Sequence, residues 1–300
     1  MAIRRTLAQA ATVLGLVAAA PALATTPAAG LFYERAVMTA ADGACRLFAP
    51  DVATALIASK TQARGAALRS GDDAASLASV EAQASDTVSR VGCASPDLAK
   101  AAQRVRAAFS GYAHLDHLTF PGEFAPWLAT RPVSLTEDAW RASQRARFGW
   151  DVMTFGLAGH GADRPLTAVA SFADGAQPYG ARLVLRDASA TSGPFLDARL
   201  ADINGHIPID GRLAPRMSAQ VFNAGEMTAA PKSLTTPDTA AAWSFHFPAA
   251  ATEALAKLDP RESVAVEFLF AGDDGESVRT AYVEVGDFAA AQAFQSVPQQ

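Results

Sequence analysis

The spacing of apolar residues divides this chain of 300 residues into two parts. From about residue 30 to residue 115, apolar positions recur every three or four residues, the spacing of a helix that buries one face. Residues typical of helix ends divide this region into four segments, at 34–48, 50–71, 72–92 and 95–112. The pattern therefore predicts a bundle of about four helices, in which abundant alanine allows close packing.

After residue 140 apolar and polar residues alternate, which is the period of a strand with one buried face. The alternation is clear over residues 164–172, 179–187, 242–247, 263–270 and 276–285, and residues 248–262 are typical of a short helix. The sequence therefore predicts an α+β protein. A helical bundle built from small residues precedes a mainly antiparallel β-sandwich or barrel-like domain with a short helix.

The boundary between the two periods contains the sequence FPGEFAPW, residues 120–127. Pro121, Pro126 and Pro132 interrupt regular structure there, so we expect a linker whose aromatic residues Phe120, Phe124 and Trp127 pack between two domains. The predicted division is a signal peptide at 1–24, a helical domain at 25–117, a linker at 118–139 and a β-rich domain at 140–296.

The N-terminal residues have the pattern of a secretory signal. Arg4 and Arg5 precede an almost wholly apolar run from Leu7 to Ala20, and small residues flank Leu23 directly before Thr25. A membrane anchor is the alternative, but a spanning helix needs about 20 apolar residues and this run is shorter. We therefore expect cleavage after Ala24 and a periplasmic or secreted protein.

The charge balance is mildly acidic. The formal net charge is −5, with 25 basic and 30 acidic residues, and removal of residues 1–24 would take away two arginines and change it to −7. No basic cluster is present, which argues against nucleic acid as a partner. No later stretch is long and apolar enough for a transmembrane segment.

Cys45 and Cys93 are the only two cysteines. An even pair in an oxidising compartment predicts a disulfide bond, which would stabilise the fold by about 4 kcal/mol through loop entropy. Two free buried thiols or a metal-binding pair are the alternatives.

Residues 114–123 contain the best candidates for chemistry. His114, Asp116, His117 and Glu123 are the candidate catalytic residues, and the histidine pair could also serve a metal. Zinc would need at least a third ligand, for which only Glu123 or the distant His160 and His206 are available. The alternative is a helix end, with the histidines near its last carbonyl groups. No nucleophile, phosphate-binding or dinucleotide-binding motif is found, so no cofactor is expected.

Two long segments in the β-rich part, 187–215 and 223–240, are rich in Gly, Pro, Ser and Thr. Loops on a rigid β scaffold are common binding surfaces. The apolar residues Phe195, Ile203, Ile207 and Leu213 must either pack down or meet a partner. Asp202, Asn204 and Asp210 have a calcium-like spacing, with ordinary turn formation as the alternative.

The C-terminal half resembles a known family. The segments AWSFHFPAAATEALAKLDPRESVAVEFLF and ESVRTAYVEVGDFAAAQAF, with the earlier strand GWDVMTFGL, are similar to the invasion-associated locus B family of exported proteobacterial β-domains. The resemblance covers about residues 148–295. It implies a periplasmic or envelope interaction protein and brings no catalytic residues with it.

Two functions follow as hypotheses. The first is an exported periplasmic or cell-envelope binding protein without a catalytic motif, whose partner is an unknown envelope protein or ligand. The second is a hydrolase that acts on a cell-wall or other polymeric substrate through the acids and histidines at 114–123. The absence of a recognisable motif favours the binding protein.

Overall fold

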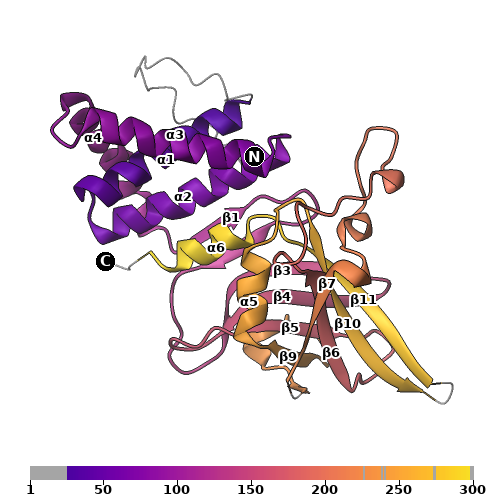
Figure 1. Cartoon of the computed structure of the whole chain (residues 1–300). Coiled ribbons are helices and arrows are strands. Elements are labelled where there is room, and N and C mark those ends of the chain that lie inside the picture. The colour runs from indigo at the N-terminus through magenta and orange to yellow at the C-terminus, as the bar shows by residue number, and fades with distance from the viewer. Residues whose placement is uncertain (1–25, 226, 238, 240, 273–274, 298–300) are drawn as a thin grey trace, which may run out of the picture.

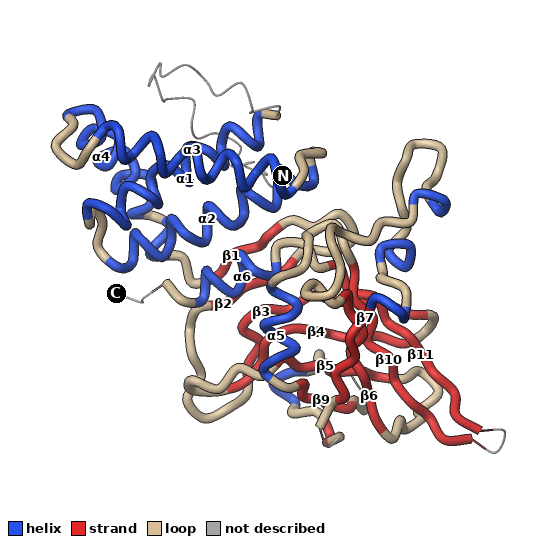
Figure 2. Tube along the Cα trace, viewed as in Figure 1, coloured by secondary structure: helices blue, strands red, loops and turns tan. Residues whose placement is uncertain are grey.

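The structure is a computed structural model that describes residues 26–225, 227–237, 239, 241–272 and 275–297. The expected signal peptide at residues 1–24 lies outside the described residues. The N-terminal helices gather at one end of the molecule, and the strands, with two short helices beside them, form the other (Figures 1 and 2). The α+β class predicted from the sequence is therefore confirmed.

Four helices form the N-terminal part, as the sequence predicts: α1 (Pro27–Cys45), α2 (Pro50–Arg69), α3 (Ala74–Val91) and α4 (Pro96–Ser110). Local chemistry sets where they begin. Thr26, Asp73 and Ser95 accept hydrogen bonds from backbone N–H groups in the first turns of α1, α3 and α4. These side chains satisfy donors that a helix leaves unpaired at its start.

Small side chains fill much of the space between the helices. Phe32, Leu68 and Leu77 form one buried cluster together with alanines of α1 and α2. Met38, Leu56 and Leu98 centre a second cluster, again with several alanines. Alanine buries little apolar area, so this bundle gains less from hydrophobic burial than one built on leucine.

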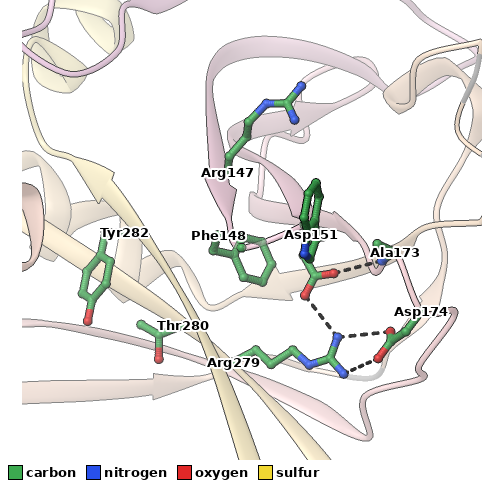
Figure 3. A pocket seen from close by; sticks show the side chains of 10 residues that line it. Arg147, Phe148, Asp151, Ala173, Asp174, Arg279, Thr280 and Tyr282 are labelled. Carbon is green, nitrogen blue, oxygen red and sulfur yellow. Dashed lines mark hydrogen bonds and ion pairs between the residues drawn. The ribbon is translucent and has the colours of Figure 1, made fainter.

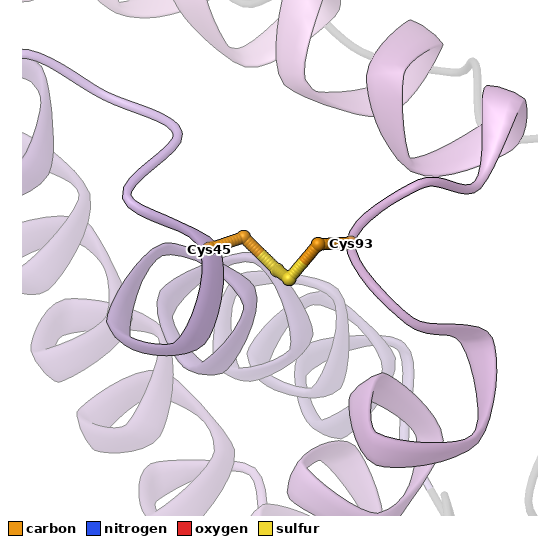
Figure 4. The surroundings of a disulfide bond; sticks show 2 residues. All are labelled: Cys45 and Cys93. Atoms are coloured by element: carbon orange, nitrogen blue, oxygen red, sulfur yellow. A yellow bond between two sulfur atoms is a disulfide. The ribbon is translucent and has the colours of Figure 1, made fainter.

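A disulfide bond joins Cys45 to Cys93 (Figure 4), as the sequence predicts. Cys45 is the last residue of α1, and Cys93 lies between α3 and α4. The Cα atoms of the two cysteines are 5.6 Å apart. The bond closes a long loop and so restricts the unfolded chain, which compensates for the low apolar burial of the bundle.

The β-rich part consists of two antiparallel sheets. One has seven strands in the order β1-β2-β3-β4-β5-β9-β8, and the other has four in the order β11-β10-β6-β7. Their bounds are β1 (His117–Phe120), β2 (Trp127–Thr130), β3 (Ala139–Phe148), β4 (Asp151–Gly159), β5 (Leu166–Ser171), β6 (Gly180–Arg186), β7 (Ala219–Asn223), β8 (Thr228–Ala229), β9 (Trp243–Phe247), β10 (Ser263–Gly272) and β11 (Gly275–Glu284). The strands expected from alternation are all present.

One apolar core lies between the two sheets and includes two short helices, α5 (Ala249–Ala256) and α6 (Phe288–Gln295). Phe268 of β10 contacts Phe148, Phe172 and Phe245, which come from the seven-stranded sheet or the segment just after β5. Helix α5 matches the short helix expected at 248–262. Helix α6 was not expected from the sequence.

Part of the segment expected to be a linker, residues 118–139, belongs to the sheet, since residues 118–120 lie in β1 and residues 127–130 form β2. Strands β1 and β2 pair with each other, and β2 pairs with β3. Phe120 and Trp127 are 0 % exposed in the core rather than packed between domains. The Trp127 indole N–H donates to the backbone carbonyls of Glu284 and Val285, at 3.2 and 3.0 Å. The strands were missed because four residues each are too few to show a period.

The carboxylate of Glu284 organises the turn between β1 and β2. It accepts hydrogen bonds from the backbone N–H groups of Glu123, Phe124 and Ala125, at 2.9, 2.9 and 3.4 Å. Gly122 is required for this close wrapping, since a Cβ there would lie 2.1 Å from the carbonyl oxygen of Ala125. Such a carboxylate, only 1 % exposed, is stabilised by the peptide donors that replace water.

Gln144 of β3 also links Glu284 to the turn between β1 and β2. Its Oε1 accepts a bond from the Glu284 N–H at 2.9 Å, and its Nε2 donates to the carbonyl of Ala125 at 3.1 Å. The side chain of Gln144 thus provides the hydrogen bonds that a neighbouring strand would otherwise make. In this way β2, β3 and β11 close one edge of the core.

The helical part contacts the β-rich part through α2 and α6. Arg69 of α2 forms two hydrogen bonds with Asp287, at 2.8 and 3.0 Å, just before α6 begins. Burial raises the pKa of the Asp287 carboxyl, and Arg69 opposes this shift. Gly65 faces the same carboxylate, where a Cβ would lie 2.7 Å from Asp287 Oδ1. The two parts are therefore joined by a specific charged contact.

We predict that the β-rich part cannot fold when the chain begins at Ser134. That chain lacks Phe120 and Trp127 and leaves the Glu284 carboxylate without its three peptide donors. Loss of a buried side chain such as Trp costs about 3–5 kcal/mol by itself. A chain that begins at Gly111 should keep cooperative thermal unfolding and a β-type circular dichroism spectrum. Equal stability of the two chains would contradict the observed sheet.

We also predict that Cys45→Ser with Cys93→Ser lowers the stability of the helical part. The loop-entropy model gives about 4 kcal/mol for the 48-residue separation. Urea unfolding followed by far-ultraviolet circular dichroism should show the helical transition at lower denaturant, while tryptophan fluorescence of the β-rich part changes little. Alkylation of two thiols in the non-reduced native protein would show that the bond is absent.

Candidate functional site

The four candidate catalytic residues do not form a cluster. His114, Asp116 and His117 are all exposed near the start of β1. His117 Nδ1 lies 3.2 Å from the Thr130 hydroxyl across the β1–β2 pair. Within the described residues, no hydrogen bond or ion pair joins any two of these four side chains. The candidate histidines and acids therefore lack the mutual geometry of a catalytic pair.

Glu123 has a different role from the one expected. Its carboxylate pairs with both terminal nitrogens of Arg212, at 2.7 and 2.5 Å. The Arg212 guanidinium also lies over the ring of Phe124, 4.7 Å from its centre, and its Nε donates to the Ile207 carbonyl at 2.9 Å. The pair ties the loop before β7 to the turn between β1 and β2. Glu123 is thus a structural partner for a distant loop.

No group suited to a metal is found among the described parts of the chain, where three or more His, Cys, Asp or Glu side chains never come together. The two distant histidines have other neighbours. His160 Nδ1 lies 2.7 Å from the Asp138 carboxylate, and His206 is near Asp202. Neither reaches the pair at 114 and 117. The sequence-based idea of a histidine metal site has no geometric support.

The long segment from Asp187 to Ser218, here called the projecting loop, stands out from the four-stranded sheet, as the orange trace of Figure 1 shows. Short 3₁₀ turns at Ala198–Leu200, Ile209–Arg212 and Arg216–Ser218 are its regular structure. It connects β6 to β7, which pair with each other, so its two ends are held side by side.

Arginine–carboxylate pairs hold the base of the projecting loop. Arg186 and Glu262 form a buried two-bond pair at 2.6 and 2.9 Å, and Glu262 also accepts the backbone N–H of Phe195 at 3.0 Å. Arg212 adds the pair with Glu123 described above. Paired, charge-assisted bonds of this kind fix orientation as well as position.

Glu267 holds a third point at the base. Its carboxylate accepts a hydrogen bond from Arg182 Nε at 2.5 Å and also pairs with Arg216, which lies at the end of the loop. Burial opposes ionisation of Glu267, but the hydrogen bonds from Arg216 and Arg182 outweigh it and lower its pKa. The carboxylate therefore stays charged, and the loop enters β7 from a fixed point.

The tip of the projecting loop is a tight turn. Asp202 accepts hydrogen bonds from the backbone N–H groups of Asn204 and His206, at 2.8 and 2.9 Å, and these bonds lower its pKa. Gly205 has a φ of 83°, a conformation that favours glycine. The calcium-like spacing of Asp202, Asn204 and Asp210 is therefore explained by turn formation, the alternative considered for it.

Apolar side chains face solvent at the tip and at the C-terminal end of the projecting loop. Ile203 and Met217 are fully exposed, at 101 % and 100 %, and Leu200 is half exposed. Phe195, Ile207 and Leu213 by contrast are partly buried. Ile207 packs close to Gly211, where a Cβ would lie 2.9 Å from its Cγ2. Of the four apolar residues singled out in the sequence, Ile203 alone is left free to meet a partner.

A cleft of about 570 Å³ lies beside the turn between β3 and β4 (Figure 3). At its floor Arg279 bonds Asp151 at 3.1 Å and Asp174 at 2.6 and 3.1 Å. The hydrogen bond from Arg279 is the main cause that lowers the pKa of Asp174 to about 2. A general acid needs a raised pKa, so this carboxylate is better suited to holding the loop in place.

Comparison of the chain with known protein families, with curated proteins and with solved structures finds no match to any of them. Function must therefore be argued from the molecule itself.

The sequence could not show the pairs that build the projecting loop. Glu123 and Arg212 are 89 residues apart, and Arg186 and Glu262 are 76 apart. The one sequence clue is Arg186, the charged residue that ends β6 after a run of apolar residues. Nothing in the sequence identifies its partner.

Proposed function

We propose that this protein is an exported, non-enzymatic interaction protein of the periplasm or cell envelope, and that it binds a protein partner through the tip of the projecting loop. The observation that carries the proposal is Ile203, an apolar residue that is fully exposed at a turn with a fixed base. A second fully exposed apolar residue, Met217, lies where the same loop returns to the sheet.

The rigidity of the loop supports a binding role. A flexible loop would lose conformational entropy on binding, about 0.5–1.5 kcal/mol for each side chain that becomes fixed. Here the ion pairs of Arg186, Arg212 and Glu267 fix the base during folding, and Asp202 fixes the tip. Exposed isoleucine gains about 25 cal/mol for each Å² of its surface that a partner covers. The loop is thus preorganised for a contact centred on an apolar residue.

Export is supported by three independent features. The N-terminal sequence has the charged, apolar and small-residue regions of a secretory signal. The disulfide bond is typical of proteins outside the cytoplasm. The resemblance of residues 148–295 to an exported family agrees with both. No helix in the described ranges is long and apolar enough to cross a membrane.

The hydrolase alternative has less support. It depends on residues at 114–123, where Glu123 is bound to Arg212 and the exposed histidines have no acidic partner within that group. No specific contact favours catalysis at these positions, so we retain the binding protein as the single proposal.

The test is site-specific photo-crosslinking in cells that export the protein. A photoreactive amino acid at Ile203 should give a discrete crosslinked band to one envelope protein. The same group at Ser79, an exposed residue of α3, serves as the control and should give none. Ile203→Asp should abolish binding of the identified partner while thermal unfolding is unchanged, because the side chain makes no internal contact to lose.

Ser192→Asp is the matched control, because it introduces the same charge at another exposed position of the projecting loop. It should leave the affinity for the partner within about twofold of that of the unchanged protein, since a surface substitution away from the contact has little effect. Equal crosslinking from Ser79, or full binding by Ile203→Asp, would show that the tip is not the contact surface.

A further inference from the structure

A groove of about 890 Å³ crosses the outer face of the seven-stranded sheet. Strands β3, β4 and β5 form its floor, and the segment around Leu234 forms one wall. That wall is fixed, because the Trp140 indole N–H donates to the Leu234 carbonyl at 3.0 Å and Leu234 packs on Ala158 and Val169. The groove is a built feature of the fold and is separate from the projecting loop, which belongs to the other sheet.

Two arginines line this groove, and among the described residues neither has a carboxylate partner. Arg145 and Arg147 are two residues apart on β3, so both point to the same face, and both are exposed. Across β4 they lie opposite Thr154 and Val152. Within the described parts of the chain no hydrogen bond or ion pair satisfies either guanidinium, and no acidic residue is among the described groove residues.

Several arginines elsewhere in the protein are neutralised by carboxylates, unlike these two. The chain has more acidic than basic residues, and eight other arginines pair with Asp or Glu: Arg69, Arg182, Arg186, Arg199, Arg212, Arg216, Arg261 and Arg279. Arg145 and Arg147 therefore create a local positive potential on a protein of negative net charge. An anionic ligand complements that potential.

The positive groove continues to an exposed tryptophan. Arg147 lines both the groove and the cleft beside the β3–β4 turn, and Trp150 lines that cleft with 90 % of its surface exposed. Gly149, with a φ of 61°, makes the turn that presents it. In Figure 3 the Arg147 side chain extends away from the Asp151–Arg279–Asp174 network, so these acids do not neutralise it.

We propose that the groove binds an anionic glycan, with Arg145 and Arg147 recognising its carboxylate or phosphate groups and Trp150 packing on a sugar ring. Guanidinium groups bind such anions through paired hydrogen bonds. Ser143, Thr154 and Ser171 bring hydroxyl groups to the same groove, which suits a ligand rich in hydroxyls. A flat indole ring buries the C–H face of a pyranose while the sugar hydroxyls stay hydrated.

The geometry disfavours an extended peptide as the ligand. A bound strand gains affinity from backbone hydrogen bonds to a free sheet edge. The floor of the groove is the face of β3, β4 and β5, whose backbones already pair with one another. Recognition must therefore come from side chains, as it does for sugars.

The test is a titration followed by tryptophan fluorescence and by calorimetry. The probes are an oligogalacturonate, a phosphorylated mannan oligosaccharide and, as the uncharged control, a malto-oligosaccharide of equal length. We expect at least one of the two anionic probes to bind, and a difference in their affinities would show whether the groove prefers carboxylate or phosphate. The neutral probe should bind at least about tenfold more weakly than the anionic probe that binds. Added salt should weaken the anionic complex.

Two double variants distinguish binding at the groove from a general effect of the protein's charge on an anionic ligand. Arg145→Ala with Arg147→Ala should weaken anionic glycan binding at least about tenfold without a change in thermal unfolding, because both side chains are exposed. Lys100→Ala with Arg104→Ala removes the same charge from exposed positions of α4 and should change binding less than about twofold. Trp150→Ala should weaken binding and remove the fluorescence change.

The proposal is overturned if neither anionic glycan binds, if the neutral probe binds equally well, or if the α4 variant loses as much affinity as the groove variant. Binding to phosphatidylglycerol vesicles but to neither glycan would assign the groove to a membrane surface and would also overturn it. None of these results bears on the projecting loop, since Ile203 is left intact in every variant.

Discussion

The buried carboxylate of Glu284 is the constraint on which the β-rich part depends. A charge with 1 % exposure is tolerated only when hydrogen-bond donors replace its water, and here the donors are peptide N–H groups of residues 123–125. The turn between β1 and β2 must therefore close around β11. Trp127 and Gln144 add bonds to the same short stretch of backbone, so three strands meet at one residue.

The same stretch also holds the helical part. Asp287 lies three residues after Glu284 and forms the two-bond pair with Arg69 of α2. Burial is the first cause that raises the pKa of Asp287, and the nearby Glu284 charge adds to it. Two buried carboxylates so close together need separate donors, which the turn and α2 supply. The end of β11 is thus the point where turn, sheet and helices are joined.

The sequence predicts what is local and misses what is distant. The four N-terminal helices are visible because caps and periodic faces lie within each segment, and β5, β6, β9, β10 and β11 because alternation persists over five or more residues. Strands β1 and β2 are too short for that test, and the residues that place them, Glu284 and Gln144, are far along the chain. The prolines that suggested a linker instead flank two short strands. The disulfide was predictable because only one pairing was possible.

The roles of the candidate binding residues also depend on distant contacts, which the sequence does not reveal. Trp127 and Trp150 are the same residue type near the ends of strands, yet one is buried and the other exposed. Arg145 and Arg147 look like other arginines in the sequence, and only the structure shows that their neighbours leave them without a carboxylate. Arg212 and Arg216 hold the base of the projecting loop through carboxylates, whereas the two arginines in the groove have no carboxylate partner among the described residues.

Amide hydrogen exchange of the turn at residues 121–126 tests the role of Glu284 most directly. The N–H groups of Glu123 and Phe124 should exchange as slowly as the centre of β10, because they open only when the core unfolds. Glu284→Gln should make them exchange much faster while amides of α3 around Leu77 keep their rates. Rapid exchange of these two amides in the original protein, or unchanged exchange in Glu284→Gln, would contradict the central place given to this carboxylate.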